Sequence, residues 1–426
     1  MRLLKNPVVV LVAFVLAHLA LIAYGNSGIG QPMGDIPNAY FPWADFMLKT
    51  HIFLGLTQSW VYPYPNLLFV LAPAGIPNLD YQTAWLIMET CIDGLAMALL
   101  LFWSVDHTGS ADSAERIRLA RVRAGWYWAL GLLLLGPVGI SRLDSISIAI
   151  AVVAVVTWAN AKPDLAAVWF AVATWIKVWP FLLVAGLAIT AKRRLRVLIY
   201  GVATGICFLV VGLLAGDFRS VLGFVFEQSD RGIQIESPWA TWWLWQGVAG
   251  VKGSGLYYDM GLLTFQVQGP GTVLLASLLG PVMYGAVAIT LVLCYLAQRK
   301  ATNFAQLQPI FAWTALTGVL DLIVFNKVGS PQYYGWLFVP VVIGILTQAE
   351  SVPEALKKWR TVGVLVLALV ALTGVVYPLA YDSILAAGPI ATSILLLRNL
   401  LAIGLLVLGN IRLTQLAKGS YWIKSN

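Results

Sequence analysis

Long apolar runs, separated by short polar segments, recur from one end of the chain to the other. A membrane-spanning helix needs about 17–25 predominantly apolar residues, and these runs are close to that length. They predict about twelve transmembrane helices, and the pair on either side of Lys177 is also consistent with one kinked helix. The segments lie near residues 7–25, 83–104, 124–140, 143–159, 164–177, 179–191, 197–215, 272–297, 306–324, 332–348, 360–381 and 392–412.

Two of the segments between the predicted helices are long, near residues 26–82 and 216–271. The aromatic residues of the first, among them Phe41 and Trp43, predict one or two short helices that lie in the membrane interface. The second holds a cluster of tryptophans that suits either an aromatic belt or a surface on which sugars stack. We expect an all-α polytopic membrane protein in which residues 1–426 form a single transmembrane domain.

Composition supports this class. The chain is 60% hydrophobic and only 11% charged, whereas about a quarter of the residues of a soluble domain are charged. Arg2 and Lys5 precede the first apolar run, which lacks a cleavage site and is typical of a retained signal anchor. The three cysteines form no CxxC pair, so neither a zinc site nor a disulfide framework is indicated.

The placement of charge predicts the orientation. Most Lys and Arg residues fall in alternate connecting segments, which the positive-inside rule assigns to the cytoplasm together with both termini. The net charge of +8 therefore reflects membrane topology and does not argue for nucleic acid. The cationic segments hold Arg116, Arg118, Arg121 and Arg123; Lys192, Arg193, Arg194 and Arg196; Arg299 and Lys300; and Lys357, Lys358 and Arg360.

The acidic and chemically richer face is accordingly expected to be external. The leading candidate for a working residue is Asp35, in the aromatic segment that follows the first apolar run. The alternative is a plain turn, in which Asp35 bonds its own backbone before Pro37.

Polar residues cluster in five places at the predicted outer ends of the helices. Charges near the membrane are expensive, and each suggests a function. Two candidate acids, Asp35 and Asp144, together with four cations on the same face suit an anionic ligand carried by a lipid. The clusters are Asp35 with Tyr40; Arg142 with Asp144; Lys177 with Trp179 and Pro180; Arg231 with Glu236 and Ser237; and Lys327 with Gln332 and Tyr333.

Structural alternatives exist for three of these clusters. Arg142 and Asp144 are equally suited to form a structural ion pair with each other. Lys177 could extend its ammonium group to the membrane surface. Ser330 and Pro331 could simply begin a helix.

Other polar residues suggest no chemistry. Glu89 and Asp93 lie four residues apart in one apolar run and are expected to bond to neighbouring helices. His18, His51 and His107 show no metal-ligand spacing, so no metal and no cofactor are expected.

The order of the motifs is similar to that of a known family over nearly the whole chain. The segments Tyr62-Pro-Tyr-Pro, Arg142-x-Asp144 and Lys177-x-Trp-Pro follow the external Gly34-Asp35 segment. Arg-Gly-Ile-Gln-Ile-Glu-Ser at 231–237 and Lys-Val-Gly-Ser-Pro-Gln-Tyr at 327–333 are the most specific. The chain resembles the polyprenyl-phosphate-sugar-dependent membrane glycosyltransferases of the C superfamily (GT-C), and most nearly glycosyltransferase family 87, the mannosyltransferases of actinobacterial envelopes.

The resemblance implies a GT-C-like fold and an inverting transfer of a hexose, mannose by analogy, for cell-envelope biosynthesis. The donor would be a polyprenyl-phosphate-linked sugar and the acceptor an extracytoplasmic lipid or glycan. Asp35 would act as general base, and Lys177, Arg231 and Lys327 would contact the donor phosphate. The remaining candidate substrate-binding residues are Tyr40, Tyr62, Arg142, Asp144, Glu236, Ser237, Gln332 and Tyr333.

The residues agree with this chemistry independently. A glycosyl phosphate carries a good leaving group, so an inverting transfer needs one base and several cations. The missing Asp-x-Asp motif argues against a nucleotide-sugar donor with a bound metal. A membrane transporter or lipid flippase is the alternative, although the chain shows no duplicated halves with matched broken helices. A non-catalytic scaffold is disfavoured by the many charges near the membrane.

Overall fold

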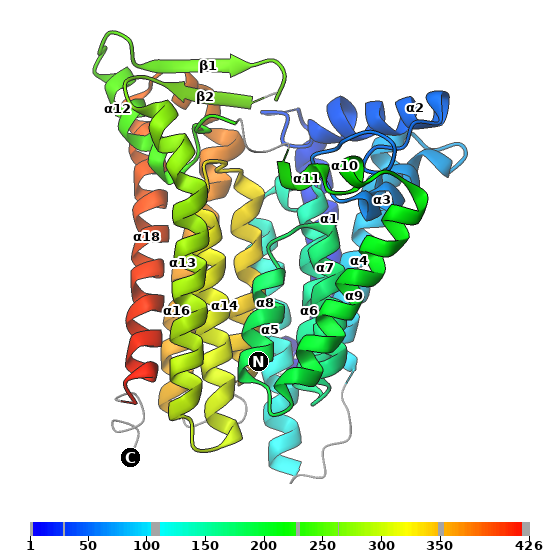
Figure 1. Ribbon diagram of the computed structural model, residues 1–426, viewed down its shortest axis with the longest axis vertical. Helices are drawn as coiled ribbons and strands as arrows, with labels where there is room; N and C mark the ends of the chain where they lie inside the picture. The colour runs from blue at the N-terminus through cyan, green and yellow to red at the C-terminus, as the bar shows by residue number, and fades with distance from the viewer. Residues whose placement is uncertain are drawn as a thin grey trace.

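The computed structural model describes residues 3–28, 30–103, 111–226, 231–262, 264–347 and 353–419. Long helices run side by side as a bundle (Figure 1). Each of the twelve segments predicted from the sequence overlaps one of them. Their bounds are α1 Pro7–Asn26, α4 Tyr81–Phe102, α5 Ala111–Leu135, α6 Leu143–Ala159, α7 Pro163–Ile176, α8 Phe181–Thr190, α9 Arg194–Ala215, α13 Thr272–Lys300, α14 Leu307–Val324, α15 Phe338–Thr347, α16 Pro353–Gly374 and α18 Pro389–Ala417.

Among the described residues, seven helical segments are long and apolar enough to cross a membrane. These are α1, α4, α9, α13, α14, α18 and the segment Trp359–Leu379, which continues α16. The helices α6, α7 and α8 are apolar but shorter. The protein is therefore a helical, membrane-embedded protein, and the count of twelve crossings remains a prediction.

Burial separates a central helix from peripheral ones. In α14, 83% of the apolar window is buried, whereas the corresponding value is 17% for α9 and 22% for α13. The exposed residues of α9 are largely aliphatic, for example Ile199 and Leu214. A helix that is apolar all round is either a core helix or faces lipid. Here α14 is the former, and α9 and α13 present lipid-facing sides.

Shorter elements gather at one end of the bundle, and the start of α1 and the end of α18 lie at the other (Figure 1). The segment after α1 contains short helices, as the sequence predicts. This end holds η2 Ile36–Tyr40, α2 Phe41–Thr50, η3 Tyr64–Asn66, α3 Leu67–Leu71, η4 Pro73–Gly75, α10 Phe218–Val221, α11 Gly223–Phe226, η6 Pro238–Ala240, α12 Thr241–Val248, η8 Pro331–Leu337, η10 Val375–Leu379 and α17 Tyr381–Leu385.

A β-hairpin at this end is a small addition to the expected all-α architecture. Its strands, β1 Gly255–Asp259 and β2 Thr264–Gln268, pair antiparallel. The residues 233–235 extend the pairing, because the Val267 amide donates to the Ile233 carbonyl at 2.9 Å. Strands of five residues are too short for their alternation to stand out in a largely apolar sequence. The hairpin fixes the position of the 231–237 motif.

The break between α7 and α8 is real and has a specific support. Lys177 leaves α7 in an extended conformation, and α8 begins directly after Pro180. The Asn66 side chain donates to the carbonyl of Ile176 at 2.9 Å and to that of Pro63 at 2.9 Å. A helix end leaves carbonyls without partners, and Asn66 satisfies one of them. The first long connecting segment is thereby joined to the break that carries Lys177.

Candidate active site

Asp35 and Arg142 meet at the end of the bundle that carries the hairpin. Asp35 directly precedes η2, and Arg142 is the extended residue before α6. Their carboxylate and guanidinium groups form a close ion pair, in which the Asp35 side chain is 41% exposed and that of Arg142 only 9%. Asp35 makes no capping hydrogen bond to η2, so the plain-turn interpretation is not supported. The carboxylate is held by a buried cation and remains open to solvent.

Asp144 and Lys177 form a second acid–cation pair, which is buried. The Lys177 Nζ lies 3.2 Å from Asp144 Oδ2, and the Trp336 indole donates to Asp144 Oδ1 at 2.9 Å. The side chains are 2% exposed for Asp144 and 14% for Lys177. The ammonium group also lies over two rings, 4.8 Å from the centroid of Tyr62 and 5.4 Å from that of Tyr333. Cation–π contacts of this kind are attractive, so the pair is held on several sides.

These contacts decide between the alternatives that the sequence leaves open. Arg142 and Asp144 do not pair with each other, because Arg142 pairs with Asp35 and Asp144 with Lys177. Lys177 does not extend to the membrane surface. Ser330 does precede a helix, the 3₁₀ helix η8, so the helix-start interpretation of that motif is confirmed.

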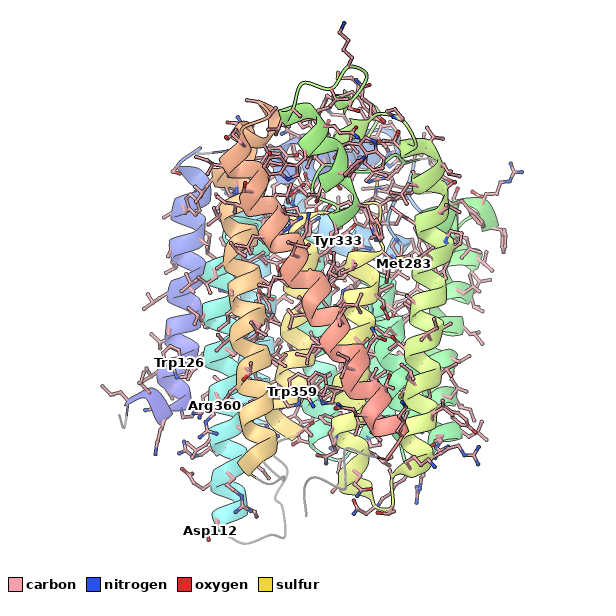
Figure 2. The ribbon with its side chains drawn as sticks, turned by 90° about the vertical axis from the view of Figure 1, so that its left-hand side faces the viewer. Asp112, Trp126, Met283, Tyr333, Trp359 and Arg360 are labelled. Carbon is pink, nitrogen blue, oxygen red and sulfur yellow. The ribbon has the colours of Figure 1, made fainter. Side chains whose placement is uncertain are left out.

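Tyrosines and tryptophans surround the two pairs. Tyr40 is buried and stacks on Trp85 with ring centroids 4.5 Å apart, and its hydroxyl accepts from the Leu143 amide at 3.4 Å. Tyr333 stacks on Trp336 at 4.2 Å. Figure 2 shows Tyr333 in the half of the bundle nearer the hairpin end. The aromatic rings fix the start of α6, and with it the positions of Arg142 and Asp144.

The 231–237 and 326–334 segments pack against each other through their backbones. The Gln234 amide donates to the Lys327 carbonyl at 2.9 Å, and the Ser237 hydroxyl donates to the Asn326 carbonyl at 2.9 Å. A side chain at Gly329 would place its Cβ 2.1 Å from the Ser237 amide nitrogen. The glycine in this motif is therefore required by close backbone approach. Two motifs that lie about ninety residues apart in sequence form one surface.

Arg231 and Gln332 border this surface. Arg231 interacts electrostatically with Tyr333, the ring over which the Lys177 ammonium group lies. The Nε of Arg231 is buried and has no hydrogen-bond partner in the part of the chain that the structure describes. Gln332 shares a small cavity with Asp144.

Glu236 is a third acid at the site and is buried close to Arg142. Its Oε2 accepts from the Gln234 side chain at 3.2 Å, while Oε1 has no partner among the described residues. Burial raises the pKa of Glu236 to about 7, and the charges of Arg398 and Arg142 partly offset this effect. Arg398, fully buried in α18, donates to the Glu236 carbonyl and lies over the Tyr334 ring, 4.7 Å from its centroid.

Two of these residues are missed by the sequence analysis. Arg398 is a cation inside a predicted membrane helix, and its cost there is a signal that could have found it. Trp336 carries no such signal, because the sequence contains 18 tryptophans and only the fold brings this one to Asp144.

Glu89 and Asp93 tie neighbouring helices together beneath the site, as expected. The Ser145 hydroxyl of α6 donates to Glu89, and the His18 ring of α1 lies 3.1 Å from Asp93. His18 also contacts the Phe14 carbonyl at 2.9 Å. These contacts brace α1, α4 and α6 against one another directly below the start of α6.

The arrangement suits proton abstraction beside an anion. An exposed carboxylate can accept a proton from a hydroxyl group, and neighbouring cations can stabilise negative charge on a leaving group. Within the described residues, no group of three or more His, Cys, Asp or Glu side chains could hold a metal ion.

Comparison with known proteins gives a family match. The model of glycosyltransferase family 87 matches residues 60–276, just over half of the chain. This range includes the Asp144–Lys177 pair and Arg231, and it ends before Lys327 and Tyr333. No curated protein and no solved structure matches the chain.

Proposed function

The chain belongs to glycosyltransferase family 87, and from this premise we propose that it transfers a hexose, mannose by family analogy, from a polyprenyl phosphate to an extracytoplasmic lipid or glycan. The reaction proceeds with inversion. A single domain, residues 1–426, carries it. The observation on which the proposal rests is the Asp35–Arg142 pair, an accessible carboxylate beside a buried cation.

Asp35 is the general base of this reaction. A base must reach the acceptor hydroxyl, and among the three acids at the site Asp35 has the exposed side chain, whereas Asp144 and Glu236 are 1% and 2% exposed as residues. Arg142 positions the carboxylate and favours its ionised form, because an adjacent cation stabilises the negative charge.

The transfer is one displacement. The Asp35 carboxylate accepts the acceptor's hydroxyl proton while the hydroxyl oxygen forms a bond to the anomeric carbon. The bond from that carbon to the phosphate oxygen breaks, and its electron pair leaves with the polyprenyl phosphate. No metal and no cofactor enters this step.

Cations stabilise the departing phosphate. Arg231 is the best placed, since its guanidinium has a buried Nε without a partner among the described residues. Lys177 contributes through its position beside Tyr62 and Tyr333. Lys327 is the third candidate, on the surface that Gln234 and Ser237 stabilise. The side chains that contact the sugar are Tyr40, Tyr62, Gln332 and Tyr333.

A cavity that faces the lipid supports a lipid-borne donor. It has a volume of about 870 Å³ and lies between α13, α14 and α18. Its lining is mostly apolar and extends from Trp239 at the hairpin end to Lys418 beyond α18. Trp239 is two residues from Ser237 and donates to the Val324 carbonyl at 2.8 Å. A polyprenyl chain in this cavity would have its phosphate near the site.

The orientation of the protein in the membrane has a separate test. We propose that the hairpin end is extracytoplasmic and that both termini are cytoplasmic, from the Lys and Arg bias. Cysteines at Ser27 and Ser254 should react with an impermeant thiol reagent in intact cells, and one at Ser113 should not. Labelling of Ser113→Cys alone would show that the protein has the opposite orientation in the membrane.

Direct transfer is the test of the function. Purified protein in nanodiscs is offered labelled polyprenyl-phosphate mannose, polyprenyl-phosphate glucose or a nucleotide sugar, each with an envelope lipid extract. The proposal expects a labelled glycan or glycolipid of inverted configuration from a polyprenyl-phosphate donor and none from the nucleotide sugar. Use of the nucleotide sugar alone, or movement of the intact donor lipid between leaflets without transfer, would contradict it.

A further inference from the structure

A second cavity lies at the opposite end of the bundle from the candidate active site. Its volume is about 580 Å³, and it is lined by residues from α5, α6, α7, α8, α14 and α15 and the turn after α8. The helix α6 starts beside Asp144 at the active site and ends at this cavity with Ala159. At 1.5 Å per residue the two sites are about 25 Å apart, so one small head group cannot occupy both.

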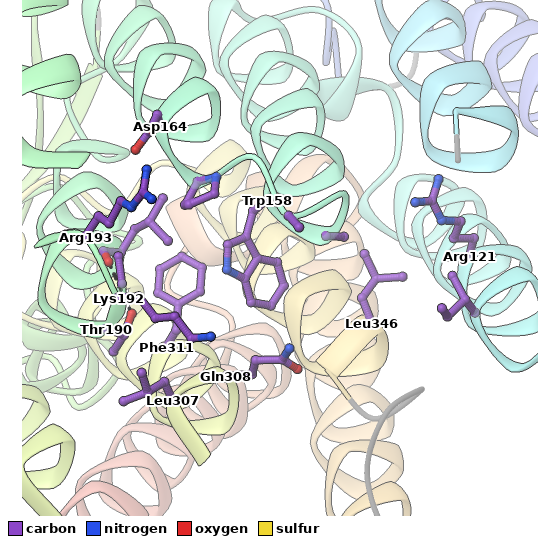
Figure 3. Close-up of a pocket in the computed structure, with 16 residues that line it drawn as sticks. Arg121, Trp158, Asp164, Thr190, Lys192, Arg193, Leu307, Gln308, Phe311 and Leu346 are labelled. Carbon is purple, nitrogen blue, oxygen red and sulfur yellow. Dashed lines mark hydrogen bonds between the residues drawn. The ribbon is translucent and has the colours of Figure 1, made fainter. Parts of the chain in front are cut away.

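The cavity combines an apolar floor with cations at its sides. Trp158 and Phe311 form the floor, with ring centroids 5.4 Å apart. Figure 3 shows Lys192 and Arg193 on one side and Arg121 on the other, with Trp158 between them. We refer to this cavity as the basic pocket.

Arg121 is a buried cation that has no buried counter-charge among the residues that the structure describes. It is 2% exposed, and its guanidinium donates to neutral oxygens, the Trp103 carbonyl and, at 2.6 Å, Asn160 Oδ1. Its Nε has no hydrogen-bond partner, and no carboxylate forms an ion pair with it, in the ranges that the structure describes. Buried charges are normally paired, because leaving one uncompensated is costly. An anion in the pocket would supply the missing charge.

Asp164, the one acid among the described lining residues, does not cancel this positive charge. Asp164 Oδ2 forms an ion pair with Arg196 at 2.7 Å, so its charge is already balanced. Its Oδ1 is buried and has no partner within the described segments, and is available to accept from a hydroxyl group of a ligand. The lining therefore offers positive charge, one acceptor and a large apolar surface.

We propose that the basic pocket binds the phosphate head group of one anionic phospholipid from the adjoining leaflet. Phosphate matches the cations, a glycerol hydroxyl matches Asp164, and the start of the acyl chains matches Trp158 and Phe311. Basic pockets between helices on the cytoplasmic side recognise anionic head groups in this way, and the Lys and Arg bias assigns this end to the cytoplasm. The bound lipid joins α5 to α8 and α14 and stabilises the inner half of the bundle.

Native mass spectrometry of the full-length protein tests this site. The protein in detergent is mixed with phosphatidylglycerol, phosphatidylcholine or inorganic phosphate. The detergent is then removed in the spectrometer, and the ligands that stay bound are counted. One phosphatidylglycerol should be retained in preference to phosphatidylcholine. The double variant Lys192→Gln/Arg193→Gln should bind it at least about tenfold more weakly, since charged hydrogen bonds are lost. These side chains are exposed, so the variant should fold.

The control is Arg299→Gln/Lys300→Gln, which removes two exposed cations from the same end of the bundle but outside the pocket. It should retain the lipid as the unmodified protein does. Equal retention of phosphatidylcholine, equal weakening in the control, or undiminished binding by Lys192→Gln/Arg193→Gln would overturn the proposal. Competition by inorganic phosphate at the same concentration as the lipid would also overturn it, in favour of a soluble anion.

Discussion

The two acid–cation pairs at the hairpin end have the same charges but different surroundings. The Asp144 side chain is 2% exposed and receives both Lys177 and the Trp336 indole, whereas the Asp35 side chain is 41% exposed and pairs with Arg142. Both pairs flank the start of α6. The two pairs therefore differ in how far the carboxylate is exposed to solvent, and not in charge.

Access determines which carboxylate can react. A buried carboxylate whose oxygens already receive an ammonium group and an indole has little room for an acceptor hydroxyl. Such a pair instead fixes the geometry of its neighbourhood, at a cost if one partner is removed. We assign the reaction to Asp35 and the organisation of the site to Asp144 and Lys177, and four substitutions can break this division.

Asp35→Asn should have the largest effect on transfer. Asn has nearly the same size but cannot accept the proton, so the rate should fall by roughly 10²–10⁴-fold. Asp45→Asn is the matched control, because Asp45 lies in the same outer segment, is also 41% exposed and also pairs with a cation, Lys49, at 2.7 Å. An equal loss in both variants would show that the segment, not the base, is being disturbed.

Asp144→Asn should mainly destabilise the protein. It leaves Lys177 buried without its counter-charge, at a cost of about 3–5 kcal/mol, which a lowered melting temperature in detergent would report. Adding Lys177→Met to the same chain should recover part of the loss, because the unpaired charge is removed. An Asp144→Asn protein with unchanged melting temperature would contradict the structural role.

Arg231→Gln should weaken donor binding by about 1–3 kcal/mol, the value of a charged hydrogen bond. Binding of a fluorescent polyprenyl-phosphate sugar measures it. Arg219→Gln serves as control, since Arg219 is an exposed cation in α10 at the same end. Equal affinity in the two variants would remove Arg231 from the phosphate site.

Glu236→Gln should produce the smallest effect, a change in the pH dependence of stability. With the pKa of Glu236 raised to about 7, the native state keeps a proton that the unfolded chain releases near its ordinary value of about 4.3. Stability therefore falls as pH rises through this window and levels off above about 7. Melting temperatures from pH 5 to 8 should decline less in Glu236→Gln, by about a few degrees. An equal decline of the melting temperature with pH in both proteins would contradict the raised pKa of Glu236.

Much of the helical architecture can be predicted from the sequence, because membrane helices need long apolar runs. The break at Lys177 is equally visible, since Pro180 cannot continue a helix. The β-hairpin is not, because five-residue strands such as Gly255–Asp259 show no period that distinguishes them from an apolar loop.

The site is predictable only as a set of residues, not as a set of pairs. The motifs identify Asp35, Arg142, Asp144 and Lys177, but proximity in sequence suggests that Arg142 pairs with Asp144. The fold separates them, because Arg142 is extended before α6 while Asp144 is already in its first turn. Their side chains consequently meet partners from different segments.

Donor binding and single-turnover transfer, measured on the same preparations of the unmodified protein, Asp35→Asn and Asp144→Asn, test the division of roles most directly. We predict that Asp35→Asn binds the polyprenyl-phosphate sugar normally and transfers it at least about a hundredfold more slowly, while Asp144→Asn loses binding and transfer together. Normal binding without transfer in Asp144→Asn, with near-normal transfer in Asp35→Asn, would contradict the account and make Asp144 the base.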